Sequence, residues 1–137
     1  MKYAEISKET MSHVYQAYNS LGNSPLDQSL RALIELRVSQ INGCAYCCGL
    51  HTTEARKLGV EQKKLDCLPS WQTASDVFFT PKERMALTWT EALVHSASSL
   101  ELREKLAAFF SEREIVDLTI TISLMGALNR ISMSLRE

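Results

Sequence analysis

The sequence predicts an all-α protein built round an antiparallel helical hairpin. Residues 80–83 and 111–114 each combine an N-cap hydroxyl with a glutamate three residues later, a specific signature of a helix start. Asn42-Gly43 is a strong signal for a helix stop followed by a turn. Residues 116–124 alternate apolar and polar side chains as a strand would, but the chain offers them no partner strand. These observations together favour helices throughout.

Two helices are expected before the turn at Asn42-Gly43. The first runs from Ser7 or Lys8 to about Leu21, and the second from about residue 26 to residue 41. The sequence Gly22-Asn23-Ser24-Pro25 separates them, since glycine and proline both end helices. The apolar face of the first helix holds Met11, Val14, Tyr15 and Tyr18, and the inward positions of the second are Leu30, Leu33, Ile34, Val38 and Ile41.

The third helix, from Cys44 to about residue 58, carries a pattern that packing explains poorly. Cys44 and Cys47 form a C-x-x-C pair and His51 follows four residues later, so on a helix all three share one stripe. Amide groups and the dipole at the helix N-terminus stabilise a thiolate at Cys44. Residues three apart on a helix lie about 5 to 6 Å apart, a separation that a disulfide tolerates. The two cysteines can therefore act as a redox couple, with His51 as proton acceptor or ion-pair partner.

Glu35 joins this group if the two helices fold back on each other. It lies seven residues before Asn42, and His51 lies eight residues after Gly43. At about 1.5 Å rise per residue, both are roughly 10 to 12 Å from the turn, so the carboxylate is expected to orient the imidazole directly or through a water. Composition alone favours a solvated or salt-bridged Glu35 instead. Glu54, three residues after His51, is a second possible carboxylate partner.

Four more helical segments are expected along the rest of the chain. A short one covers residues 61–66, the next runs from residue 81 to about 95, another from residues 98–99 to about 110, and the last from 112 to 135. Trp89 and Glu91 could line the site, although an aromatic residue at helical spacing is more often part of the core. The last helix is apolar on several faces, which suggests that a neighbouring subunit covers part of it.

Length, charge and cysteine usage narrow the class of protein. The 137 residues, 45% of them hydrophobic, suffice for one compact domain over 1–137 and are too few for two. The net charge of -1 comes from 15 basic and 16 acidic residues without blocks, so no surface for nucleic acid or membrane is indicated. With no signal-like segment, a soluble cytoplasmic protein with reduced thiols is expected. Cys67 is expected to be inert, whereas Cys48 is a bystander, a competing thiol or a packed core residue.

The run from Glu35 to His51, ELRVSQINGCAYCCGLH, closely resembles the core of the AhpD-like, carboxymuconolactone decarboxylase superfamily, and in particular its alkylhydroperoxidase branch. The resemblance continues through Ala55-Arg56, Trp89-Thr90-Glu91 and Asn129-Arg130, and so covers most of the chain. It implies an AhpD-like helical fold and an obligate homo-oligomer, usually a trimer or hexamer. It also implies thiol-dependent reduction of hydroperoxides in antioxidant defence, with the C-x-x-C cysteines as redox pair and His51 as proton relay.

Two positions depart from the pattern of the best-known peroxidase members. Those proteins carry the relay glutamate twelve residues before the first cysteine, where this chain has Ala32, and a histidine between the cysteines, where it has Tyr46. Glu35, one helical turn nearer the cysteines, is the candidate to replace the missing glutamate. The decarboxylase branch generally lacks the C-x-x-C pair, which argues against lactone decarboxylation.

The residues leave three functions open. The first is a peroxidase whose disulfide an external dithiol reduces, or a related disulfide exchanger. The resemblance implies that this dithiol is of thioredoxin or lipoyl type. The second is a zinc site, but one helix supplies three candidate ligands where structural zinc takes four, so no metal or other cofactor is predicted. The third is a binding or oligomerisation module whose cysteines are incidental or sense oxidants. Which of Cys44 and Cys47 attacks, and which hydroperoxide or disulfide is the substrate, stay open.

Overall fold

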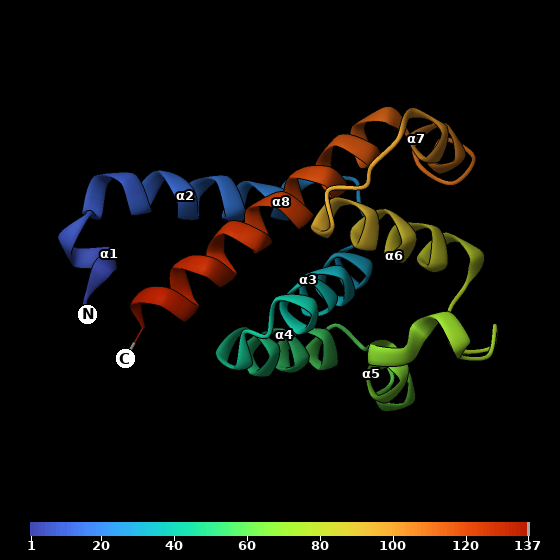
Figure 1. The fold of residues 1–137 in the computed structure, drawn as a ribbon, viewed down its shortest axis with the longest axis horizontal. Coiled ribbons are helices and arrows are strands. Elements are labelled where there is room, and N and C mark those ends of the chain that lie inside the picture. Colours follow the sequence, from blue (N-terminus) through green and yellow to red (C-terminus); the bar gives the residue numbers. More distant parts are fainter. Residues whose placement is uncertain (137) are drawn as a thin grey trace.

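A computed structural model describes residues 1–136, and over that range the chain forms helices and connecting turns without a strand (Figure 1). The all-α prediction is confirmed. In chain order the elements are α1 (Tyr3–Ile6), α2 (Lys8–Ser20), the 3-10 helix η1 (Leu21–Asn23), α3 (Gln28–Asn42), α4 (Ala45–Lys57), α5 (Gln62–Cys67), the 3-10 helix η2 (Leu68–Thr73), α6 (Pro81–Val94), α7 (Leu100–Leu106) and α8 (Glu112–Leu135).

Helix α3 is the central element of the fold. It packs against α4, α6 and α8, and Figure 1 shows it between α4 and the long α8. Because three helices cover it, α3 is buried on more than the single stripe of a surface helix. Of its predicted inward positions, Leu30, Leu33, Ile34 and Val38 are buried and Ile41 is half-buried.

The predicted stop and start signals set the helix boundaries. Gly43 ends α3 with a φ of 74°, a left-handed conformation that favours glycine. Thr80 caps α6 through its side chain, which accepts from the Glu83 amide, and Ser111 and Glu114 form the complete capping box that begins α8. The hairpin and the last two long helices therefore begin and end within a residue or two of the predicted positions.

Helix α8 confirms that residues 116–124 are helical. By length and composition it is the one helix in the described range that could cross a membrane, yet 44% of its most apolar stretch is buried inside the fold. It also carries buried polar side chains: Asp117 accepts a hydrogen bond from Ser24, and Asn129 donates to Ser39. These contacts are those of a helix that packs in the core of the fold.

Two of the α-helices differ from the expectation. The helix predicted to reach residue 110 ends at Leu106, since the amides of Ala107 to Phe109 bond to carbonyls three residues back and close tight turns. These turns bring the buried side chain of Phe110 into the core. The short helix α1 was not predicted, and four residues without a buried side chain leave little periodic signal to find.

Candidate active site

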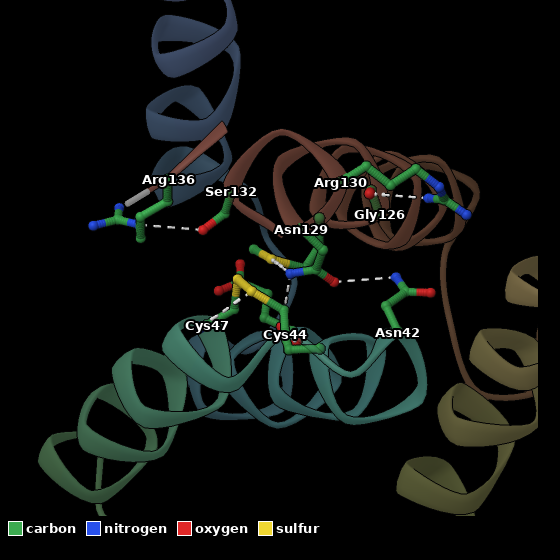
Figure 2. The surroundings of a disulfide bond; sticks show 11 residues. Asn42, Cys44, Cys47, Gly126, Asn129, Arg130, Ser132 and Arg136 are labelled. Atoms are coloured by element: carbon green, nitrogen blue, oxygen red, sulfur yellow. Dashed lines mark hydrogen bonds between the residues drawn. A yellow bond between two sulfur atoms is a disulfide. The ribbon is translucent and has the colours of Figure 1, made fainter. Parts of the chain in front are cut away.

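The cysteine pair lies where α3 turns into α4. Cys44 is the N-cap of α4, with Sγ accepting from the Cys47 amide at 3.4 Å. The two residues are joined by a disulfide, with 5.2 Å between their Cα atoms (Figure 2). Both are buried, at 1% and 6% exposure. The helix N-terminus thus supplies one amide donor to the Cys44 sulfur, as expected for a helix that begins after Asn42-Gly43.

His51 lies one turn beyond Cys47, on the same face of α4. Its ring is 3% exposed, and its Nδ1 lies 2.9 Å from Glu54 Oε2 and 3.2 Å from Glu35 Oε2. Burial lowers the pKa of His51, but the hydrogen bond and charge of Glu35, and then of Glu54, outweigh it and raise the pKa above its usual value. Because Nδ1 is held by carboxylates, Nε2 is the ring nitrogen left for a thiol.

Glu35 is 1% exposed, so of the two alternatives that composition alone favoured it is the salt-bridged one and not the solvated one. The hairpin prediction is also confirmed, since the Glu35 carboxylate contacts the imidazole directly. Tyr18 donates its hydroxyl to Glu35 Oε2 at 2.9 Å, and Arg31 Nε lies 3.3 Å from Oε1. These partners offset the cost of burying the charge. We call Glu35, His51 and Glu54 the ionisable cluster.

The sequence prediction did not include Tyr18 or Arg31 in the site. Arg31 precedes Glu35 by four residues, and an Arg–Glu pair at that spacing on a helix is a signal that could have been used. Tyr18 comes from α2 and was assigned only to an apolar face. Burial and the charge of Glu35 raise the pKa of Tyr18 far above its ordinary value, so its hydroxyl keeps its proton and remains a donor.

A second polar cluster, of uncharged groups, adjoins the disulfide. Asn129 of α8 donates to Ser39 Oγ and accepts from the Asn42 amide, both at 3.1 Å, and Figure 2 shows its side chain directed from α8 toward the hairpin. Ser39 and Asn129 are fully buried. Ser39 in turn donates to the backbone carbonyl of Glu35 at 2.8 Å. We call Ser39, Asn42 and Asn129 the amide clamp, since it fixes α8 against the hairpin.

A cavity of about 460 Å³ opens beside the cysteine pair. Cys47, His51 and Glu54 line it, together with side chains from α1, α2 and α8, whereas Cys44 does not. A second cavity of about 390 Å³ contacts Glu35 and Glu54, and Tyr18 borders both cavities. The ionisable cluster therefore lies between the two cavities. Of the two cysteines, Cys47 lines the 460 Å³ cavity and Cys44 does not.

The other residues named from the sequence lie elsewhere. Trp89 is a core residue whose Nε1 donates to Thr119 at 3.0 Å. Glu91 does not line the site, because its carboxylate accepts from Arg37 at 2.7 Å and from Trp71 at 3.0 Å and so ties α6 to α3 and η2.

The remaining two cysteines are free thiols. Cys48 and Cys67 are half-buried and pack against the hydrophobic core. Burial raises the pKa of the Cys48 thiol, which makes it a poorer nucleophile at neutral pH. Of the alternatives given for Cys48, a residue packed against the core therefore agrees with the structure better than a competing thiol does.

Two groups of side chains could bind a metal in principle. The sulfur atoms of Cys44 and Cys47 are engaged with each other in the disulfide, which leaves neither as a thiolate ligand for zinc in this state. The ligand atoms of Glu35, His51 and Glu54 all lie within 4.8 Å of one another. Arg31 forms an ion pair with the Glu35 carboxylate, although Glu35 Oε1 accepts no hydrogen bond, and the imidazole Nδ1 lies within hydrogen-bond distance of both carboxylates. The three groups can therefore share a proton without a metal.

The chain is similar in sequence to proteins of one family. The model of the Carboxymuconolactone decarboxylase family matches residues 8–92. The uncharacterised protein YdfG of Bacillus subtilis is 33% identical over 98% of this chain and 92% of that protein. The uncharacterised protein YnjA of Escherichia coli is 27% identical, over 82% of this chain and 62% of that protein.

Two solved structures share the fold. One is a protein of unknown function from Agrobacterium tumefaciens, described as a candidate antioxidant defence protein AhpD, with a TM-score of 0.91 and 32% identity over 100% of this chain and 94% of that one. The other is an uncharacterised peroxidase-related protein from Silicibacter, with a TM-score of 0.83 and 24% identity over 93% of this chain and 69% of that one. The second likeness concerns the fold alone.

Proposed function

Since this chain belongs to the carboxymuconolactone decarboxylase family and has the AhpD-like fold, we propose that it is an alkylhydroperoxidase-type peroxidase that reduces hydroperoxides through Cys44 and Cys47 in antioxidant defence. One observation carries the proposal. Cys47 and a histidine held by two carboxylates line the same cavity, which supplies a nucleophile, a proton relay and a place for substrate together. The description of the Agrobacterium protein as a candidate antioxidant defence protein supports the same assignment.

Cys47 is the attacking thiol in this proposal and Cys44 the resolving one. Cys47 lines the cavity and lies one turn from His51, whereas Cys44 is 1% exposed and lies outside the cavity wall. His51 draws the proton from Cys47, and Glu35 and Glu54 stabilise the imidazolium that forms. Glu35 thereby replaces the relay glutamate that is absent at Ala32, which is itself buried on α3.

The reaction balances with two thiols and one hydroperoxide. The Cys47 thiolate attacks the terminal oxygen of ROOH, so that an S–O bond forms, the O–O bond breaks, and the RO⁻ leaving group takes a proton to become ROH. Cys44 then attacks the sulfenic acid, forming the S–S bond and releasing water once a second proton is supplied. The two thiols lose two electrons and the hydroperoxide gains them.

Turnover then requires an external dithiol, and a thioredoxin-like or lipoyl-type protein is the proposed reductant. A cytoplasmic location suits such a partner. We also propose a homo-oligomer, a trimer or hexamer. Helix α8 supports this proposal, because Val116 and Ile120 on its surface are 53% and 43% exposed and a neighbouring subunit would cover them.

The test is coupled turnover of an alkyl hydroperoxide with a dithiol, comparing wild type with Cys44→Ser, Cys47→Ser and, as a matched control, Cys48→Ser. We expect wild type and Cys48→Ser to turn over. Both other variants should lose activity by at least about a hundredfold, because neither can complete the disulfide cycle. A wild type that is inert toward hydroperoxides yet exchanges its Cys44–Cys47 disulfide with dithiols would instead be a disulfide exchanger or an oxidant sensor.

A further inference from the structure

Every tyrosine of this protein lines the cavity that opens on Cys47. The chain has four tyrosines, and Tyr3, Tyr15, Tyr18 and Tyr46 come to the cavity from α1, α2 and α4. Tyr15 and Tyr46 are 39% and 49% exposed, so packing leaves part of each ring open, although Arg136 covers one face of Tyr46. Aromatic rings prefer other aromatic rings in offset or edge-to-face contact, and this wall therefore favours a ligand with a ring of its own.

The cavity is far too large for the smallest hydroperoxide. Hydrogen peroxide is little bigger than water, whose share of liquid volume is about 30 Å³, whereas the cavity holds about 460 Å³. That volume lies in the range of sites for organic ligands. Leu50, Met125 and Leu128 add apolar surface to a wall that also holds the polar side chains of Asn19 and Ser132. A hydroperoxide with an organic group can contact this apolar surface, and hydrogen peroxide has no such group.

The charges around the cavity favour an uncharged ligand. Glu54 lines the cavity, with its side chain 39% exposed, so a carboxylate would oppose an anionic substrate there. Arg136 is the one arginine or lysine in the described part of this wall. It is already engaged, 3.4 Å from the centre of the Tyr46 ring and hydrogen-bonded to Ser132 at 3.3 Å. Figure 2 shows it at the end of α8, beyond Ser132.

We infer that the substrate class of this site is an uncharged organic hydroperoxide that carries an aromatic ring. The ring lies among the tyrosines, and the peroxide group reaches Cys47 beside His51. This inference rests on the proposed peroxidase function for its chemistry, and it adds the selectivity that the tyrosine wall confers.

The first experiment measures binding without turnover. The oxidised wild-type protein is titrated by calorimetry with 2-phenyl-2-propanol, the alcohol product of cumene hydroperoxide, and with 2-cyclohexyl-2-propanol, which has the same carbon skeleton and a similar size but lacks the π-system. We expect the phenyl compound to bind several-fold more tightly, and Tyr15→Ala to abolish the difference while Tyr15→Phe retains it. Phe109→Ala, which removes a ring of similar exposure (37%) near α7, is the control and should retain it too. Equal affinities in wild type would overturn the inference.

The second experiment measures selectivity in turnover. With a dithiol in excess, we expect kcat/KM for cumene hydroperoxide to exceed that for tert-butyl hydroperoxide by roughly tenfold, and that for hydrogen peroxide by more. Equal kcat/KM values would remove the aromatic selectivity and leave the peroxidase standing. If none of the three hydroperoxides is turned over but the phenyl alcohol still binds more tightly, the proposed peroxidase function is refuted and the aromatic binding site is supported.

Discussion

Two largely buried polar clusters adjoin the disulfide, one able to ionise and one not. Both reach α3, where Glu35 of the ionisable cluster and Ser39 of the amide clamp lie one turn apart and are joined through a hydrogen bond to the Glu35 carbonyl. In the ionisable cluster, two carboxylates converge on one nitrogen of His51, beside a cavity. In the amide clamp, uncharged donors and acceptors pair with each other and tie α8 to the hairpin.

The two clusters have different expected roles: the ionisable cluster acts in proton transfer, and the amide clamp stabilises the fold. Converging carboxylates shift the pKa of His51 and can pass a proton to a group in the cavity, which is what a relay requires. Paired amides and hydroxyls change no charge between pH 5 and 9, and each hydrogen bond contributes about 1 kcal/mol to stability. We therefore expect substitutions in the first cluster to alter thiol reactivity and substitutions in the second to alter the free energy of unfolding.

The largest effect is expected from Glu35→Gln. This change keeps the size of the side chain and removes the charge that stabilises the His51 imidazolium, so the apparent pKa of the Cys47 thiol should rise and peroxide reduction at pH 7 should slow by roughly a hundredfold. The measurements are pH-dependent alkylation of the reduced protein and the coupled peroxidase assay. An unchanged alkylation profile would remove Glu35 from the relay. Circular dichroism of the variant should confirm that the helical fold is intact.

A smaller effect, of the opposite kind, is expected from Asn129→Ala. It leaves Ser39 and Asn42 without their partner, and we expect the free energy of unfolding in urea to fall by about 2 kcal/mol. Ser123→Ala, an exposed position on the same helix, is the control and should change stability by less than about 0.5 kcal/mol. If Asn129→Ala also shifted the alkylation profile, the division between the two clusters would not hold.

The smallest effect is a pH dependence of stability carried by His51. Its pKa is raised in the folded protein, so its protonated form contributes stability that is fully present below the unfolded value of 6.5 and is lost as pH rises through the raised folded value. The urea midpoint should therefore fall from pH 6 upward, and His51→Gln should flatten this part of the profile. A slope retained in His51→Gln would assign the dependence to another group.

Local patterns predicted the hairpin and all three members of the ionisable cluster, but not Tyr18 and Arg31, which contact Glu35. Asn42-Gly43 fixes the turn, and similar distances from it along the two helices place Glu35 opposite His51. The hairpin geometry therefore accounts for the burial of Glu35, which composition alone argues against. Tyr18 escaped prediction because its partner lies 17 residues away across a break, where no periodicity relates the two.

The amide clamp escaped prediction for a similar reason. Its hydrogen-bonded pairs join residues that are 87 and 90 positions apart in the chain. A polar side chain on an apolar helix is expected to be exposed unless the position of the neighbouring helix is known. The cavity is less accessible still to sequence reasoning, because its wall comes from four helices whose relative positions only the packing determines.

The position of the chain ends has a consequence for the order of folding. The Met1 amine donates to the carbonyl of Leu135, 134 residues along the chain, and Tyr3 and Arg136 both line the cavity. The thiol pair and its relay, in contrast, lie within residues 35–54 and close through short loops. Short loops close at low entropic cost and early in folding. We therefore expect a partly folded chain to form the reactive thiol pair before the cavity wall is complete. At that stage the thiols would react with compounds that the finished cavity excludes.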